Sequence, residues 1–118
     1  MIFRTLFFLS IFIVLSVSFA FAADKSGAYS VLGEGTMSCG TLVQSVHNAE
    51  NTDKVIIGSW VNGYLTAINQ FKYKRINVAQ GTDREARELW IYNYCQKNPL
   101  DNLATATSSL YAELLKKY

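Results

Sequence analysis

Apolar residues are distributed along the chain in two different ways. The first 22 residues carry an almost unbroken apolar run, from Leu6 to about Phe21, behind the cationic residue Arg4. From about residue 37 onward, apolar positions recur every three or four residues, which is the spacing of an amphipathic α-helix. No stretch alternates apolar and polar residues over the length of a strand. The pattern predicts an export or anchoring segment followed by a small all-α domain of four to five helices.

Helical periodicity is clear in the first half of that domain. Ser38 is suited to cap a short first helix, and Asp53 suits the start of a second. Gly58 and Gly63 each cost about 1 kcal/mol relative to alanine in a helix. They therefore predict the close approach of a neighbouring helix or an aromatic ring. The apolar positions are Leu42, Val43 and Val46 in the first helix, and Ile57, Val61, Leu65 and Ile68, flanked by Trp60 and Tyr64, in the second.

Capping signals predict where the last two helices start. Thr82 and Glu85 form a Thr-x-x-Glu capping box, which places a third helix over about 86–95. Asn98-Pro99 predicts the start of the last helix, with the asparagine as cap and Asp101 in the first turn. This helix carries Leu103, Ala106 or Thr107, Leu110 and Leu114, and finishes on Lys116 and Lys117.

The N-terminal run has the form of a cleaved secretory signal peptide. It closes with Ala20-Phe21-Ala22, the small-x-small pattern that signal peptidase accepts, and polar residues follow. The alternative is a membrane anchor, because about 16 apolar residues lie near the lower limit for a bilayer span. We expect a signal peptide over 1–22, a flexible arm over 23–36 and a helical domain over 37–118. The mature protein is then periplasmic, without a stable membrane anchor.

Export changes the meaning of the two cysteines. In an oxidising compartment, two cysteines in a small domain pair more often than they bind metal or react as thiols. Cys39 and Cys95 would close a loop of about 57 residues, worth roughly 4 kcal/mol in chain entropy. Neither cysteine has an activating base nearby in the sequence. The sequence therefore predicts one structural disulfide.

Without the predicted signal peptide, the composition excludes several classes of function. The remaining chain has 10 Lys/Arg and 9 Asp/Glu, a formal charge of +1, which argues against nucleic-acid binding through phosphates. One His and two Cys are too few for a structural zinc site. The sequence has no Gly-rich phosphate loop and no Gly-x-Ser-x-Gly elbow. We expect neither a metal nor a cofactor.

No constellation of residues predicts catalysis. His47 is the single imidazole, and its sequence neighbours form no recognised catalytic group. Asp83, Glu85 and Glu88 could act as paired carboxylates, but negative charge near a helix start is stabilising by itself. The basic stretch 72–75 could touch anionic lipid or nucleic acid, although three charges in a loop are usually only solvated. We expect no catalytic residues and no enzymatic activity.

The aromatic residues exceed what so small a core needs. The segment Leu89–Tyr94 is apolar or aromatic on almost every side, so this helix is either central in the bundle or covers a partner. Core packing accounts for most of these rings, and a patch for self-association or client binding accounts for the excess. The candidate partner surface comprises Trp60, Tyr64, Trp90 and Tyr94.

Four short stretches carry a resemblance to a known family. They are Met37-Ser38-Cys39, Trp60-Val61, Tyr94-Cys95-Gln96-Lys97-Asn98-Pro99 and Asn102-Leu103. The pattern, which covers about residues 35–115, resembles the HdeA/HdeB family of periplasmic acid-stress chaperones and is HdeB-like. The resemblance implies a disulfide at Cys39 and Cys95 and a homodimer at neutral pH. It also implies acid-triggered dissociation, which exposes apolar surface to unfolding periplasmic proteins.

The charge count is compatible with such an acid response. Near pH 2 the 9 carboxylates of the mature chain are neutral, whereas the 10 Lys/Arg and His47 are cationic. The side-chain charge therefore rises from +1 to about +11, and self-repulsion on this scale loosens compact states and dimers. A disulfide would keep the acid state partly compact.

A second class of function stays open. Small exported helical proteins also serve as immunity or inhibitor proteins that bind a secreted toxin. Gly63-Tyr64-Leu65 and Asn98-Pro99 loosely resemble the Rap1a/Tai immunity family, whose members generally carry further cysteines that this chain lacks. A structural envelope protein is a third possibility. A chaperone acts on unrelated clients in acid, whereas an immunity protein binds one specific partner at neutral pH.

Overall fold

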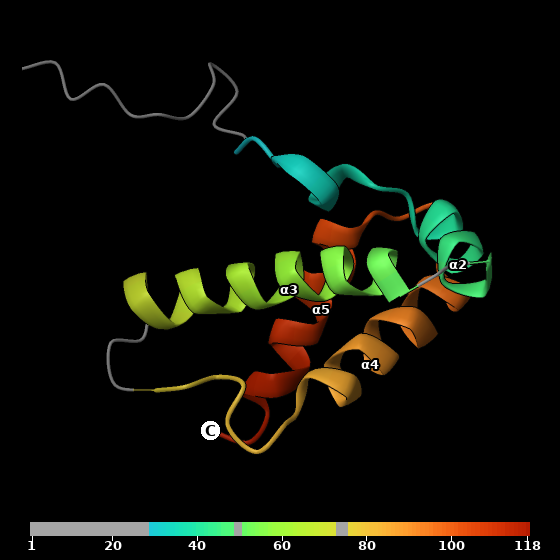
Figure 1. The fold of residues 1–118 in the computed structure, drawn as a ribbon. Coiled ribbons are helices and arrows are strands. Elements are labelled where there is room, and N and C mark those ends of the chain that lie inside the picture. Colours follow the sequence, from blue (N-terminus) through green and yellow to red (C-terminus); the bar gives the residue numbers. More distant parts are fainter. Residues whose placement is uncertain (1–28, 49–50, 73–75) are drawn as a thin grey trace, which may run out of the picture. The chain divides into compact units, whose positions relative to one another are not determined.

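The computed structural model describes residues 29–48, 51–72 and 76–118 (Figure 1). The predicted signal peptide, residues 23–28 of the predicted arm, residues 49–50 and residues 73–75 lie outside the described residues. The chain divides into two compact units, Met1–Ser30 and Val31–Tyr118. In the first unit, the described residues Tyr29 and Ser30 have no regular secondary structure. All helices named below belong to the second unit.

The second unit is all-α, as the periodicity predicts. It contains one 3₁₀ helix, η1 (Gly33–Thr36), and four α-helices, namely α2 (Cys39–Asn48), α3 (Asn51–Phe71), α4 (Arg84–Lys97) and α5 (Leu103–Leu115). Helix α2 lies beside the start of α3 and the end of α4 (Figure 1). None of the helices in the described residues is long and apolar enough to cross a membrane.

The core lies where the four α-helices meet. Leu42 of α2, Val61 of α3 and Leu103 of α5 are each at most 1% exposed. Burying an aliphatic side chain of this size stabilises the fold by about 1.5–3 kcal/mol. The hydroxyl of the buried Thr107 donates to the Leu103 carbonyl at 2.7 Å, so the polar group is satisfied within the core. Further buried apolar residues are Ile57, Leu65, Val78, Ile91, Ala106, Leu110 and Leu114.

The predicted disulfide is confirmed. It joins Cys39 at the start of α2 to Cys95 in α4, and both residues are fully buried. Main-chain bonds reinforce it, because the Cys39 N–H donates to the Asp101 carbonyl at 2.7 Å. In addition, the Leu103 N–H donates to the Met37 carbonyl at 2.9 Å. The start of α2 is therefore fixed both to α4 and to the α4–α5 connection.

The capping box predicted for α4 is wrong by one residue. Asp83 is the N-cap, and its carboxylate accepts a hydrogen bond from the Ala86 N–H at 2.7 Å. The Thr82 hydroxyl instead donates to the Ala79 carbonyl at 2.7 Å and closes the preceding turn. Aspartate is the better cap of the two neighbours, because its carboxylate is the stronger acceptor. Glu85 then lies too close to the helix start to complete the box.

The start predicted for the last helix is also wrong. Asn98 follows α4 as its C-cap, and its side-chain amide donates to the Tyr94 carbonyl at 2.9 Å. The N-cap of α5 is Asn102, whose side-chain oxygen accepts from the Thr105 N–H at 2.9 Å. Both asparagines are capping residues, but the first ends a helix and the second begins one. Pro99 lies in the turn between them.

Part of the predicted N-terminal arm packs against the domain. Gly35 of η1 lies under the Trp60 ring, and a Cβ at this position would collide with the indole. The indole Nε1 donates to the Leu32 carbonyl at 2.9 Å. Gly33 has a φ of +59°, a conformation that favours glycine. The compact second unit therefore starts at Val31, six residues before the boundary that we predicted at residue 37.

The two glycines of α3 have different surroundings. A Cβ at the buried Gly58 would collide with the Glu88 carboxylate and lie 3.0 Å from the Arg84 guanidinium. The predicted close approach of a neighbouring helix is therefore confirmed at Gly58, although the contact is polar. At Gly63 no described atom lies within 4 Å of the Cβ position, so the prediction is wrong there.

Candidate functional site

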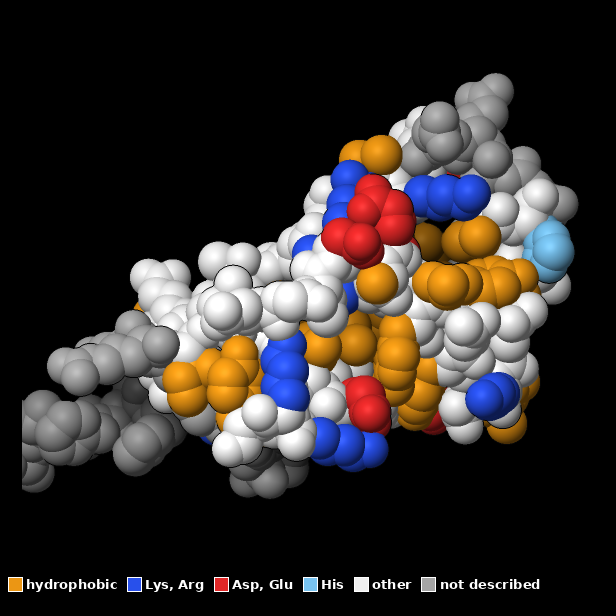
Figure 2. All heavy atoms as spheres, turned by 90° about the horizontal axis from the view of Figure 1, so that it is seen from below, with side chains coloured by type: hydrophobic (Ala, Val, Ile, Leu, Met, Phe, Trp, Pro, Cys, Tyr) orange, Lys and Arg blue, Asp and Glu red, His pale blue; other side chains and the backbone are white. Residues whose placement is uncertain are grey.

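An apolar cavity of about 430 Å³ lies between α2, α3 and α4. This volume falls within the range of small-ligand pockets. Figure 2 shows one face of the molecule, where hydrophobic side chains gather beside acidic and basic ones and the histidine lies at the edge. The lining residues are Leu42, Val46, Lys54, Ile57, Glu85, Glu88, Leu89, Ile91 and Tyr92.

The floor of the cavity belongs to the packed core. Leu42 and Val46 are four residues apart on α2, so they share the face that turns toward α3 and α4. Ile57 of α3 and Ile91 of α4 complete the floor, and they are 4% and 1% exposed. A floor of fully packed side chains gives the cavity a fixed apolar base.

The mouth of the cavity exposes apolar surface. Leu89 lines the cavity and is 60% exposed. Lys54, Glu85 and Glu88 also line the cavity, and together with Arg84, which pairs with Glu88, we call them the charged rim. An exposed aliphatic side chain at a cavity with a charged rim is typical of a surface that binds another molecule.

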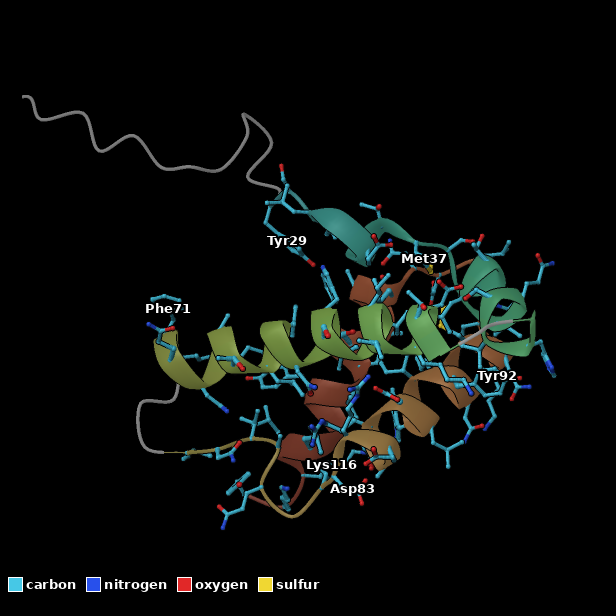
Figure 3. The ribbon with its side chains drawn as sticks, in the orientation of Figure 1. Tyr29, Met37, Phe71, Asp83, Tyr92 and Lys116 are labelled. Carbon is cyan, nitrogen blue, oxygen red and sulfur yellow. A yellow bond between two sulfur atoms is a disulfide. The ribbon has the colours of Figure 1, made fainter. Side chains whose placement is uncertain are left out.

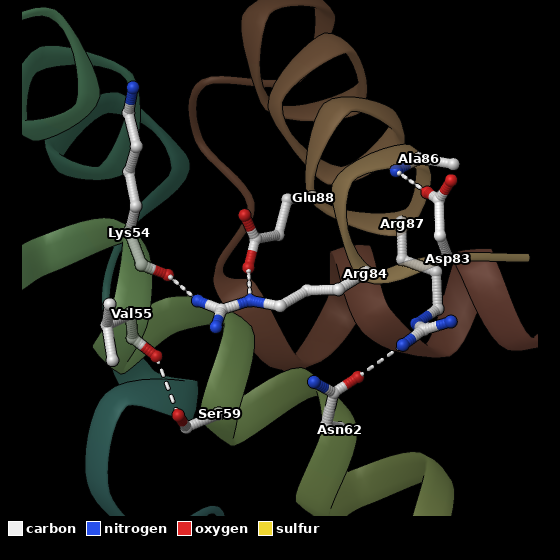
Figure 4. Close-up of polar contacts among 9 residues, drawn as sticks. All are labelled: Lys54, Val55, Ser59, Asn62, Asp83, Arg84, Ala86, Arg87 and Glu88. Atoms are coloured by element: carbon white, nitrogen blue, oxygen red, sulfur yellow. Dashed lines mark hydrogen bonds and ion pairs between the residues drawn. The ribbon is translucent and has the colours of Figure 1, made fainter. Parts of the chain in front are cut away.

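A polar link holds α4 against α3 on one side of the mouth (Figure 4). The Arg84 guanidinium forms an ion pair with the Glu88 carboxylate one turn later on α4. Its Nη2 also donates to the Lys54 carbonyl of α3 at 3.3 Å. The hydrogen bond from Arg84 to Glu88, and then the charge of this carboxylate, raise the pKa of Arg84. Gly58 leaves the space that this link occupies.

Arg87 forms a second link between the same two helices. Its Nη2 donates to the Asn62 side-chain oxygen of α3 at 2.9 Å (Figure 4). Its Nη1 donates to the Thr82 carbonyl at 2.8 Å, just before α4 begins. The Arg87 link does not include a carboxylate. It therefore stays in place when acidic side chains are neutralised.

His47 lies beside the lining residue Tyr92 but does not itself line the cavity. Its Nε2 is 3.0 Å from the hydroxyl of Tyr92, and the Gln96 amide donates to this hydroxyl at 3.2 Å. Figure 3 shows Tyr92 projecting from α4 toward the end of α2. The three side chains join α2 to α4 by hydrogen bonds. Within the described ranges, no group of three or more His, Cys, Asp and Glu could hold a metal ion.

The three candidate carboxylates have separate surroundings. Asp83 caps α4, whereas Glu85 and Glu88 both line the cavity. Glu88 is half-buried and paired with Arg84, and Glu85 is exposed. The structure therefore brings two of the three acidic side chains to one apolar cavity.

The four predicted aromatic residues form two ring pairs. Trp60 and Tyr64 have centroids 5.7 Å apart on α3, and Trp90 stacks on Tyr94 at 5.6 Å on α4. All four rings are half-buried, and none lines the cavity. Their role as a partner surface stays a prediction. The Tyr94 hydroxyl donates to the Asp101 carboxylate at 2.7 Å. Asp101 precedes α5 and accepts this bond, so the prediction that it lies in the first turn of the last helix is wrong.

The cavity itself was not predicted from the sequence. The sequence indicated only core positions for four lining residues, Leu42, Val46, Ile57 and Ile91. No pattern in it singled out Lys54 as part of a site. Leu89 belongs to the run that is apolar on every side, and this run is the one pattern that indicated an open surface on α4. The basic stretch 72–75 lies away from the cavity in its one described residue, Lys72, whose Nζ is 5.2 Å from the centroid of the Tyr111 ring.

Comparison with known proteins identified no relative of this chain, since no family model, no curated protein and no solved structure matches it.

Proposed function

We propose that this protein is a periplasmic, acid-responsive chaperone whose cavity between α2, α3 and α4 binds apolar side chains of unfolding proteins. One observation carries the proposal: Glu85 and Glu88 line the same cavity as the exposed Leu89. A chaperone needs apolar surface that it can expose, and an acid response needs titrating groups at that surface. The proposal agrees with the HdeB-like pattern of the sequence.

Acid changes the charge balance of the rim. At neutral pH, the positive charges of Lys54 and Arg84 are balanced by the negative charges of Glu85 and Glu88. The Arg84–Glu88 pair packs against Gly58 of α3. At pH 2 both carboxyls are neutral while both cations remain, so the rim changes from zero to +2. The ion pair is lost, and the two cations repel each other. This repulsion favours separation of the α3 start from the α4 start and opens the cavity.

The same residues suit a homodimer at neutral pH. In a two-fold interface, each patch meets an identical patch, so a basic and an acidic residue on one patch can pair reciprocally. The cavity mouth provides Lys54 on α3, Glu85 on α4 and the apolar Leu89 nearby. We therefore propose that a second copy covers the mouth at neutral pH. Neutralisation of Glu85 removes the reciprocal pairs and uncovers it.

Client aggregation across pH tests the proposal. The chain from residue 23 onward, without the predicted signal peptide, is mixed with an unrelated aggregation-prone protein at pH 7 and at pH 2.5. Light scattering reports the aggregation of that protein, and the binding of a hydrophobic dye reports the exposed apolar surface. We expect suppression of aggregation and a gain in dye binding only in acid. Absence of suppression at every acidic pH contradicts the proposal. If the protein instead binds one specific partner at neutral pH, the immunity alternative is supported.

A neutral-pH variant separates the rim from general charging. Glu88→Gln removes the negative charge that pairs with Arg84. We therefore expect the variant to bind more hydrophobic dye at pH 7, approaching the amount that the wild type binds at pH 2.5. Glu113→Gln is the matched control, because Glu113 also pairs with a cation on its own helix, Lys116, but lies outside the cavity. Equal dye binding by the two variants at pH 7 contradicts a role for the rim.

A further inference from the structure

A second surface lies at the end of the unit where α3 and α5 finish. Its exposed residues are two aromatics and three lysines, and we name it the lysine–aromatic end. Phe71 is 76% exposed and Tyr118 is 59% exposed, which is unusual for rings of this size. Figure 3 shows Phe71 at the end of α3, pointing away from the bundle. The lysine–aromatic end comprises Phe71, Lys72, Lys116, Lys117 and Tyr118.

Contacts between distant segments connect the end of α3, and the residues after it, with α5 and the residues that follow it. The Lys72 Nζ of the α3 end lies 5.2 Å from the ring centroid of Tyr111 on α5. The Tyr118 hydroxyl donates to the Asn77 carbonyl at 2.8 Å, and the Lys117 Nζ donates to the Gln80 carbonyl. The connection that follows α3 is therefore tied to the residues that follow α5.

The charge of this surface is predominantly positive. Among the described residues at the ends of α3 and α5, Lys72, Lys116 and Lys117 are basic and Glu113, which pairs with Lys116, is acidic. Cations near helix C-termini are stabilising in their own right, which explains lysines at these positions. Helix stabilisation does not explain two exposed rings beside them. The Lys117 Nζ lies 5.6 Å from the Tyr118 ring centroid, so the ammonium group and the ring are neighbours on the surface.

We propose that the lysine–aromatic end docks on a bilayer surface rich in anionic phospholipid. Lysines bind lipid phosphates while their stems lie along apolar surface, and aromatic rings enter the interface at the headgroup level. Each lysine near an anionic bilayer increases partitioning by about fivefold, and salt screens the effect. The charge complementarity argues for lipid, and the two rings argue against a site for soluble anions alone. The lysine–aromatic end shares no residue with the cavity, so this proposal does not depend on the chaperone function.

Vesicle co-sedimentation tests the proposal with a matched pair of double variants. The exported protein is incubated at low salt with vesicles of phosphatidylglycerol or of phosphatidylcholine. Phe71→Ser/Lys117→Glu removes one exposed apolar residue and reverses one exposed lysine of the lysine–aromatic end. Leu100→Ser/Lys97→Glu makes the same changes elsewhere, at a leucine that is 99% exposed and an exposed lysine of α4. Circular dichroism and the Tm verify that both variants are folded.

We expect the wild type and the Leu100/Lys97 variant to bind phosphatidylglycerol vesicles and to be released at high salt. The Phe71/Lys117 variant should partition at least about 25-fold more weakly, because the reversal of one lysine changes two units of charge and the ring is lost as well. Equal partitioning of the two double variants overturns the proposal, as does equal binding to both lipids. The single variant Phe71→Ser gives a further test. If it binds as the wild type does, the surface attracts anions in general and does not dock on a bilayer.

Discussion

The residues of one apolar run in the sequence, Leu89–Tyr94, meet different surroundings on the two flanks of α4. On one flank, Trp90 stacks on Tyr94, whose hydroxyl is bound to Asp101 beside the disulfide. On the other, Leu89 is 60% exposed and Tyr92 lines a cavity. A helix that is apolar on every side therefore need not be buried on every side. The two flanks meet different neighbours: the Asp101 carboxylate on one side, and the cavity with its charged rim on the other.

Removing the disulfide that joins α2 to α4 has the largest expected effect. Cys39→Ser/Cys95→Ser releases a loop whose ends are 56 residues apart in sequence. We expect a loss of about 4 kcal/mol, which lowers the Tm by roughly 15 °C or more in a domain of this size. Thermal unfolding followed by circular dichroism measures it, and wild type treated with reductant is the control. A Tm within about 2 °C of the wild type would contradict the structural role of the bridge.

Truncation on either side of the cavity separates its floor from its mouth. Ile91→Ala removes a side chain that is 1% exposed, so we expect a loss of about 2–5 kcal/mol in the free energy of unfolding. Leu89→Ala alters an exposed residue of the same helix and should change this free energy by less than about 0.5 kcal/mol. Urea unfolding at pH 7 measures both. Similar losses in the two variants would mean that the floor and the mouth of the cavity do not differ as described.

The two tyrosine hydroxyls compare the flanks atom for atom. Tyr94→Phe removes the bond to the Asp101 carboxylate and should cost about 1–2 kcal/mol at pH 7, because the acceptor is charged. Tyr92→Phe removes only exposed contacts to His47 and Gln96, and we expect a smaller loss. Urea unfolding at pH 7 measures both losses. A loss for Tyr94→Phe no larger than that for Tyr92→Phe would contradict this assignment.

The start of α4 gives the smallest expected effect. Asp83→Ala removes the N-cap acceptor of the Ala86 N–H and should cost about 1 kcal/mol at pH 7. Asp83→Asn keeps a capping oxygen and should retain most of the stability, and it should keep the cap in acid as well. The Tm of the three proteins at pH 7 measures the difference. If Asp83→Ala matches the wild type, the cap does not lie at Asp83.

The fold was largely predictable from local patterns. The stripe Ile57, Val61 and Leu65 requires only helical spacing, and it is buried as predicted. Capping residues were harder, because neighbouring candidates compete: Asp83 took the position predicted for Thr82, and Asn102 the role predicted for Asn98. Such competition depends on which acceptor reaches the free N–H groups, and only the structure shows this geometry.

The candidate site was not predictable in the same way. The cavity arises where three helices meet incompletely, and each contributes residues that look like ordinary core or surface positions. Gly58 illustrates the difference: its lack of a side chain predicted a close approach, but only the structure identified the Arg84–Glu88 pair as the neighbour. Gly63 gave the same signal in the sequence and has no described atom close to its Cβ position.

The most direct test of the account is client aggregation at pH 2.5 with a matched pair of leucine variants. Leu89→Ser alters the cavity mouth, whereas Leu100→Ser alters an exposed leucine in the α4–α5 turn. If the cavity binds unfolding proteins, the wild type and Leu100→Ser suppress aggregation and Leu89→Ser loses most of this activity. Suppression by Leu89→Ser equal to that of the wild type would contradict the central claim.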